Sequence, residues 1–303
     1  MVPPRIAFLG AGRLARGLAL AFARGGLNVA AVASRSPESA GWLAQRLSAE
    51  GCQASALSMQ AAVDTADLVF ITVPDDSIAA TAALLQWRSG VAAVHCSGAT
   101  EVSALDAARR SGAATGGFHP MQVFTDPEAA AASLPGCTVS IEADEPLFSQ
   151  LRGIAEAIGC RALQLPPGSR ARYHASGNYA AAFINVLLRE ASFIWQSFGM
   201  SEADAVQALL PLVKGTIASV EAQGLARGMA GPVSRGDVGT VQSHVDSLAR
   251  VSDRTLDFYC ELARRMIPLA LERGSIDAVK AAELERVLGG KTGFPRTFEH
   301  APK

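Results

Sequence analysis

The stretch RIAFLGAGRLARGLALAFARGG, residues 5–26, decides the fold. Ile6 to Leu9 is a short apolar run that predicts a strand, and apolar residues at helical spacing from Leu14 to Ala23 predict a helix. Between them, residues 10–15 have the pattern Gly-x-Gly-x-x-Ala. A strand, a glycine turn and a helix in this order are typical of a dinucleotide-binding fold. The alternative is a plain tight turn between a strand and a helix.

Each small residue of the turn has a predicted role. Gly10 permits the tight turn, Gly12 has no Cβ and so lets a pyrophosphate approach, and Ala15 lets the helix pack on the strand. The free N–H groups and the dipole at the start of the helix favour negative charge there. We therefore predict cofactor contacts at Gly10 and Gly12 and, beside them, at Arg13 and Leu14.

Length, charge and cysteine usage narrow the class of protein. The chain has 303 residues, which fits two domains as a soft prior. A formal net charge of −1 predicts no nucleic-acid partner and no membrane-surface partner. The five cysteines are scattered with no metal-type C-x-x-C spacing, so we expect no metal site and reduced thiols in the cytoplasm. We also expect no signal peptide and no membrane span.

The end of the second predicted strand, residues 27–34, indicates which dinucleotide is bound. An NAD site usually has an acidic residue here for the ribose 2′-hydroxyl, but this chain has Ser34, Arg35 and Ser36. Two hydroxyl donors and a guanidinium suit a 2′-phosphate. We predict NADP as the cofactor; the alternative is a surface arginine after a strand.

A buried fourth strand, residues 67–73, ends where ligands lie in such sheets. We predict cofactor contacts at Val73 and Pro74. We expect Asp75 or Asp76 to cap the next helix rather than to contact the ligand.

Two further strand ends supply candidate site residues. After the strand at 91–95, the backbone amides at Ser97 and Gly98 can approach a nicotinamide or a substrate carboxylate. The alternative is a simple turn with Thr100 as a helix N-cap. His119 precedes a proline, which favours an extended backbone, and is either a site histidine or a hydrogen-bonded structural one.

Strand patterns disappear after Pro166. We predict an α/β domain, a doubly wound Rossmann-type sheet, over residues 1–166 and an all-helical domain for substrate binding and dimerisation over 167–303. The expected helices are 170–198, 201–223, 238–250, 252–273 and 275–288, with N-caps at Ser201, Ser252 and Ser275 and a loose tail from Gly289.

The first of these helices carries the most informative spacing. His174 and Asn178 are four residues apart and share one face, whereas Tyr173 and its apolar neighbours are expected to be core. A polar stripe on a buried helix needs partners, which a bound ligand would supply. The alternative is a histidine in the first turns of a helix, bonded to a nearby carbonyl.

The layout resembles the 6-phosphogluconate-dehydrogenase-like superfamily, which includes ketopantoate and pyrroline-5-carboxylate reductases. Branches of that superfamily carry Lys-x-x-x-Asn on the helix that opens the second domain; here His174 takes the place of the lysine and Asn178 matches the asparagine. More narrowly, the segments GFHPMQVF, HASGNYAAAF and GPVSRGDVGTVQSHVDSL resemble the Rossmann-like family with a domain of unknown function 2520 (DUF2520).

The resemblance implies hydride transfer from NADPH to a carbonyl or imine carbon, with a placed acid to protonate the oxygen or nitrogen. His174 is the predicted acid, because an unperturbed histidine titrates near the working pH. Asn178 would orient the acceptor. His119 is the next candidate acid, and Lys214 ranks lower.

Arg235 has two interpretations. It either clamps a substrate carboxylate or pairs with Asp237 in a loop, with Asp237 capping the next helix and Gly236 supplying the bend. His244 is a weaker candidate for the same cleft or for a dimer partner.

The sequence thus predicts an NADP(H)-dependent oxidoreductase of a small oxo or imino acid, with ketopantoate-like substrates among them. The alternative is a non-catalytic NADP(H)-binding sensor or accessory protein. The resemblance also implies a homodimer formed through the helical domain.

Overall fold

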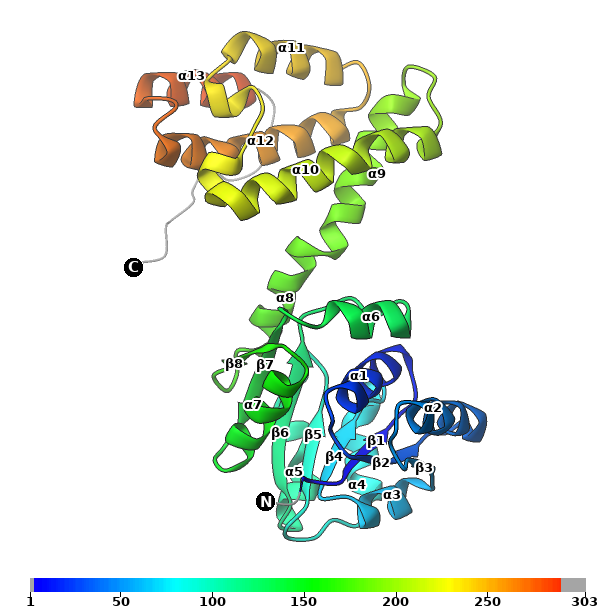
Figure 1. Ribbon diagram of the computed structural model, residues 1–303. Helices are drawn as coiled ribbons and strands as arrows, with labels where there is room; N and C mark the ends of the chain where they lie inside the picture. The colour runs from blue at the N-terminus through cyan, green and yellow to red at the C-terminus, as the bar shows by residue number, and fades with distance from the viewer. Residues whose placement is uncertain (1–2, 290–303) are drawn as a thin grey trace. The chain divides into compact units, whose positions relative to one another are not determined.

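The computed structural model describes residues 3–289. The chain forms two compact units that divide between Ala182 and Phe183 (Figure 1). The first unit extends beyond residue 166 because Arg170, at the start of α8 (Arg170–Ala180), is buried against strands of this unit. The predicted domain limits at 166 and 167 stay a prediction. No helix among residues 3–289 is long and apolar enough to cross a membrane.

The first unit alternates strands and helices along the chain. Its strands are β1 (Ile6–Leu9), β2 (Val29–Ala33), β3 (Ser55–Ala56), β4 (Leu68–Ile71), β5 (Ala92–His95), β6 (Ala114–Pro120), β7 (Thr138–Ala143) and β8 (Arg161–Gln164). Its helices before α8 are α1 (Arg13–Arg24), α2 (Pro37–Ala49), α3 (Met59–Thr65), α4 (Ile78–Leu84), α5 (Asp106–Arg110), α6 (Pro127–Ser133) and α7 (Leu147–Ala157).

The strands form one mostly parallel sheet in the order β3-β2-β1-β4-β5-β6-β7-β8. Every neighbouring pair is parallel except β6 with β7. Chain order therefore reverses between β1 and β4, the crevice where doubly wound sheets bind nucleotides. The predicted fold class is confirmed.

Both faces of the sheet are covered, as a parallel sheet requires. On one face, α1, α2 and α7 pack on a core that includes four aromatic rings, those of Phe8, Phe22, Phe70 and Phe118. Phe8 and Phe70 stack with their centroids 5.4 Å apart. On the other face, α3, α4 and α5 pack on alanine and branched side chains of the same strands.

The second unit is helical, with a core of its own. Its helices are α9 (Ala182–Gln196, which begins at the last residue of the first unit), α10 (Glu202–Gly228), α11 (Val238–Leu248), α12 (Asp253–Arg273) and α13 (Ala278–Leu288). Ser201 and Ser252 cap α10 and α12 as predicted, each accepting a backbone N–H three residues on.

The helix expected over 201–223 ends where predicted, because Gly224 has a non-helical φ of 77° and ψ of 174°, and a short further helical segment runs on to Gly228. Two other details of the predicted helices were wrong. The helix expected over 170–198 is interrupted at Ala181, which has a non-helical φ of −124° and ψ of −78°. Asp277 caps the last helix, because the Ser275 hydroxyl instead donates to the carbonyl of Ser234. The expected loose tail lies outside the described residues from 290 onward.

Candidate active site

The glycine turn after β1 has the geometry needed for a close approach by phosphate. Gly10 has a φ of +120°, and a Cβ there would lie 2.6 Å from the carbonyl oxygen of Thr72. Gly12 caps α1 and is exposed, and a Cβ on it would have nothing within 4 Å. The fold therefore requires glycine at position 10, whereas the open space at position 12 can accept a ligand.

The serines after β2 are arranged so that they can donate to an anion. The Oγ of Ser34 accepts the N–H of Ser36 at 3.3 Å, and the Oγ of Ser36 accepts the N–H of Ser39 at 3.2 Å. Because each oxygen accepts from a backbone N–H, each hydroxyl hydrogen is available to donate. Arg35 between them is exposed.

A polar strip crosses one face of β5, β6 and β7. Residues two apart on a strand share a face, and the register pairs His95 with Gly117 and His119 with Ser140. The polar strip consists of His95, Ser97, Gly117, His119, Ser140 and Glu142. Buried polar side chains need partners, and the first turns of α8 supply several of them.

Two histidines converge on the backbone at Gly98. A Cβ at Gly98 would lie 2.5 Å from Cδ2 of His174 and 2.8 Å from Nε2 of His119, so any other residue would require both rings to shift. The two histidine rings lie 5.8 Å apart between centroids. The Tyr173 hydroxyl is 3.1 Å from Nδ1 of His119, which directs Nε2 toward Gly98. The structure thus brings together His119, His174 and the Ser97–Gly98 turn.

Arg170 anchors α8 to the polar strip. Its side chain is fully buried, with Nε donating to Oε2 of Glu142 at 2.7 Å and Nη1 donating to the carbonyl of Ser97 at 2.6 Å. Gly117 lies directly beneath, and a Cβ there would overlap Nη2 of Arg170. Burial raises the pKa of Glu142, and the arginine opposes that shift.

The Ser97 side chain is used within the protein. Its hydroxyl donates to Oδ2 of Asp75 at 2.7 Å, and its oxygen accepts the N–H of Thr100 at 2.9 Å. The predicted cap was therefore wrong, because neither Asp75 nor Asp76 caps α4. The alternative of Thr100 as a helix N-cap is also contradicted, because the next helical turn begins after Glu101. Asp75 instead fixes the turn after β5, because its carboxylate reaches across from the end of β4.

Both histidines of the polar strip favour the neutral form. Burial, followed by the positive charges of His174 and Arg170, lowers the pKa of His119 to about 4, with Asp75 opposing. Burial and Arg170 lower the pKa of His95 to about 3. Because Nδ1 of the neutral His119 is engaged by the Tyr173 hydroxyl, only Nε2 is available for a hydrogen bond near Gly98. The low pKa also makes this ring a weak proton donor or acceptor at physiological pH.

The other predicted residues are on α8, on α10 and in the segment after β4. Asn178 is exposed on α8, one turn beyond His174, and Lys214 is exposed on α10. Val73 and Pro74 follow β4, in front of the 3₁₀ turn Asp75–Ser77.

The loop before α11 has the conformation expected if Asp237 caps the helix and Gly236 supplies the bend. Gly236 adopts a left-handed φ of +67°, and the Asp237 carboxylate accepts the N–H of Thr240, capping α11. Arg235 is exposed at the start of that bend, and its role toward substrate stays a prediction. His244 is engaged by Tyr259, with Nδ1 2.9 Å from the hydroxyl.

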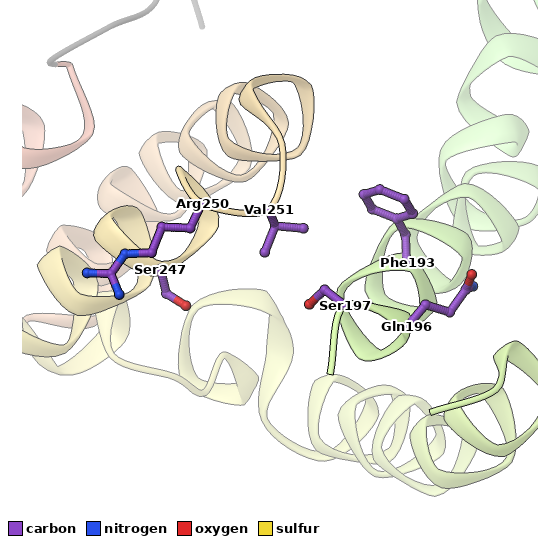
Figure 2. Close-up of a pocket in the computed structure, with 6 residues that line it drawn as sticks. All are labelled: Phe193, Gln196, Ser197, Ser247, Arg250 and Val251. Atoms are coloured by element: carbon purple, nitrogen blue, oxygen red, sulfur yellow. The ribbon is translucent and has the colours of Figure 1, made fainter. Parts of the chain in front are cut away.

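A pocket in the second unit is lined by no pair of side chains that could act as acid and base. It lies between the end of α9 and the turn after α11, as Figure 2 shows. Its lining residues are Phe193, Gln196, Ser197, Ser247, Arg250 and Val251. Arg250 is the one charged side chain among them, so this pocket lacks the groups for proton transfer.

Sequence reasoning missed three residues of the cluster. Arg170 and Glu142 went unremarked, and Tyr173 was expected in the core although its hydroxyl bonds His119. A signal existed: Ser140 and Glu142 alternate with apolar residues in TVSIEA, and Arg170 precedes His174 by one helical turn.

Two family models match the chain. The model described as NADP oxidoreductase coenzyme F420-dependent matches residues 5–97, from β1 to the serine of the turn after β5. The model described as Domain of unknown function (DUF2520) matches residues 137–266, which include β7 and α8. No curated protein matches the chain.

Solved structures share the fold over most of the chain. Protein TM1727 from Thermotoga maritima is 24% identical, with a TM-score of 0.72, 89% of this chain covered and 99% of that one. A reductive aminase from Aspergillus terreus, in complex with NADPH and ethyl-5-oxohexanoate, is 14% identical, with a TM-score of 0.62 and coverages of 94% and 99%. A pyrroline-5-carboxylate reductase from Coxiella burnetii is 14% identical, with a TM-score of 0.57 and coverages of 93% and 98%.

Substitutions at Gly12 and Gly10 should differ in their effects on stability and on NADPH binding. Gly12→Ala should leave the free energy of unfolding within about 1 kcal/mol of wild type, because the added methyl meets no protein atom. It should weaken NADPH binding at least about tenfold by blocking the pyrophosphate. Gly10→Ala should destabilise the fold itself. Urea unfolding and NADPH fluorescence titration measure both, and equal NADPH affinity in Gly12→Ala and wild type would contradict the cofactor role.

The lowered histidine pKa values predict acid sensitivity. Below about pH 6.5 the unfolded chain protonates His95 and His119 while the folded chain does not, so stability falls with pH toward 4. Each histidine contributes up to about 1.4 kcal/mol per pH unit. Urea unfolding between pH 6.5 and 5 should show a shallower fall in His119→Gln than in wild type. An identical slope in the two proteins would mean that His119 titrates normally.

Proposed function

Because the chain joins a nucleotide-binding domain of the NADP oxidoreductase type to a domain of the DUF2520 family, we propose that it is an NADPH-dependent reductase of a small oxo or imino acid. The observation that carries this is the pair of histidines above Gly98, at the carboxyl end of β5. β5 lies beside β4, which in turn lies beside β1, so its carboxyl end is on the sheet edge along which a bound dinucleotide would extend from the glycine turn.

The residues around the glycine turn fit NADP. The open space at Gly12 would take the pyrophosphate, and the hydroxyls of Ser34 and Ser36 with the Arg35 guanidinium would hold the 2′-phosphate. When bound, the nicotinamide supplies the hydride. Both histidine rings lie close to the backbone of the Ser97–Gly98 turn, so a larger residue at position 98 would collide with them.

The two histidines take different roles. His174 is exposed on α8 and donates the proton to the substrate oxygen or nitrogen as negative charge develops there. His119 is held neutral by burial and donates a hydrogen bond to the same atom. Asn178 orients the acceptor through its side-chain amide. The likeness in fold to a reductive aminase solved with NADPH and an oxo ester supports this substrate class.

Turnover with a panel of small oxo and imino acids tests the proposal. NADPH oxidation should be seen with at least one 2-oxo acid, ketopantoate or cyclic imine acid. His174→Gln should then lower kcat about 100-fold or more while the NADPH Kd changes little. NADPH binding with no oxidation by any of these compounds would instead support a sensor or accessory protein. Unchanged kcat in His174→Gln would remove His174 from the mechanism.

Cofactor choice is tested at Arg35. Arg35→Ala should weaken NADPH binding about tenfold or more and leave NADH binding nearly unchanged, because only NADPH carries the 2′-phosphate. Fluorescence titration with each nucleotide measures the two affinities, and Arg13→Ala, at the other end of the phosphate path, gives a comparison. Equal losses for both nucleotides in Arg35→Ala would contradict the NADP assignment.

We also propose a homodimer formed through α9 and α10. Among their residues only Ser192, Ala205 and Gly228 are buried, although both helices are rich in apolar side chains. Exposed examples are Val186 at 48%, Phe193 at 45%, Leu212 at 67%, Ile217 at 56% and Leu225 at 68%. Helices of this length are stabilised by burying an apolar face, and a second copy offers a matching one.

Light scattering after size-exclusion chromatography measures the assembly. Wild type should have twice the mass of one chain, and the double variant Leu212→Glu/Ile217→Glu should be monomeric or unstable because it places charge in the interface. Val279→Glu, at a residue of α13 that is 68% exposed, is the matched control and should remain dimeric. A monomeric wild type would overturn the dimer proposal.

A further inference from the structure

The guanidinium of Arg170 joins three parts of the site that are distant in sequence. It comes from the first residue of α8, donates to Glu142 on β7 and donates to the carbonyl of Ser97 after β5. Tyr173 and His174 follow three and four residues later, so they lie above the same part of the sheet. A shift of Arg170 would therefore move both the helix and the turn beneath it.

The bond to Ser97 also sets the direction of the next amide. In a trans peptide the N–H points opposite to the carbonyl, so holding the Ser97 carbonyl fixes the N–H of Gly98. Within residues 3–289, the Gly98 N–H has no hydrogen-bond acceptor although Gly98 is buried. A charged donor on the carbonyl also strengthens the same peptide as a donor.

A contribution to stability does not by itself explain why an arginine is buried at position 170. Its side chain has no exposure, yet Nη2 has no hydrogen-bond partner among the described residues. Replacing a buried ion pair by apolar side chains is often neutral for stability or stabilising. Stability therefore does not require the Arg170–Glu142 pair, which suggests that function retains it. Gly117 is also required to leave room for the guanidinium, which adds a second constraint.

We propose that Arg170 is a positioning residue: it orients the Ser97–Gly98 peptide as a hydrogen-bond donor to a ligand oxygen and holds His174 above it. The ligand oxygen belongs to a carboxamide or a carboxylate, the groups that accept from a backbone N–H. The proposal rests on the reductase function for its kinetic consequences, but the orientation of the Gly98 amide is independent of turnover.

The central variant is Arg170→Met/Glu142→Gln, which removes both charges and so leaves no unpaired buried carboxylate. It should remain folded by circular dichroism, bind NADPH with a Kd within about threefold of wild type, and lose kcat about tenfold or more. Arg170→Lys keeps the charge but replaces the planar fork of the guanidinium by a single ammonium, and should show a similar loss. Arg172→Met, at an exposed arginine on the same helix, is the matched control with unchanged kcat.

An amide measurement tests the orientation without any substrate. In glycine-labelled wild type, the Gly98 amide resonance should shift when NADP⁺ or a small oxo acid is added, and this shift should be lost or much reduced in the double variant. A purely structural anchor predicts lower thermal stability with wild-type kcat and a wild-type Gly98 response, and that result would overturn the proposal. If wild type reduces no substrate, the reductase function fails while the amide response still decides the role of Arg170.

Discussion

The candidate site depends on the interactions of the buried Arg170 guanidinium. It connects the first turn of α8 to the end of β5 and to β7, and those three elements carry the functional groups. A charge with no access to solvent tolerates little displacement, because each lost hydrogen bond leaves a desolvated donor. Burial lowers the pKa values of His95 and His119, and the charge of Arg170 acts in the same direction.

The space beside the glycine backbone shapes this site as much as its polar side chains do. Gly98 admits two imidazole rings, and Gly117 admits the guanidinium, because neither has a Cβ to occupy the same volume. At Gly12 the equivalent space is open. Protein side chains thus occupy the space beside Gly98 and Gly117, whereas the space beside Gly12 is open.

The sequence predicted the sheet, its helices and the glycine turn because those depend on local patterns. It placed His119, His174 and the Ser97–Gly98 turn among the candidates, but it could not show that they meet. Its errors in helix capping fell where a tertiary contact replaced a local preference. Asp75 bonds Ser97 instead of capping a helix, and Ser275 bonds the carbonyl of Ser234, so Asp277 caps α13 instead.

By itself the sequence determined the nucleotide-binding fold, because a strand, a glycine turn and a helix specify their backbone within about twenty residues. Only the tertiary structure decided the electrostatics of the candidate site. Arg170 and the Ser97 carbonyl are separated by 73 residues, and their contact is created by the order of the strands. Burial and charge act through space, so the neutral state of His119 and the anchoring of α8 appear only once the chain is folded.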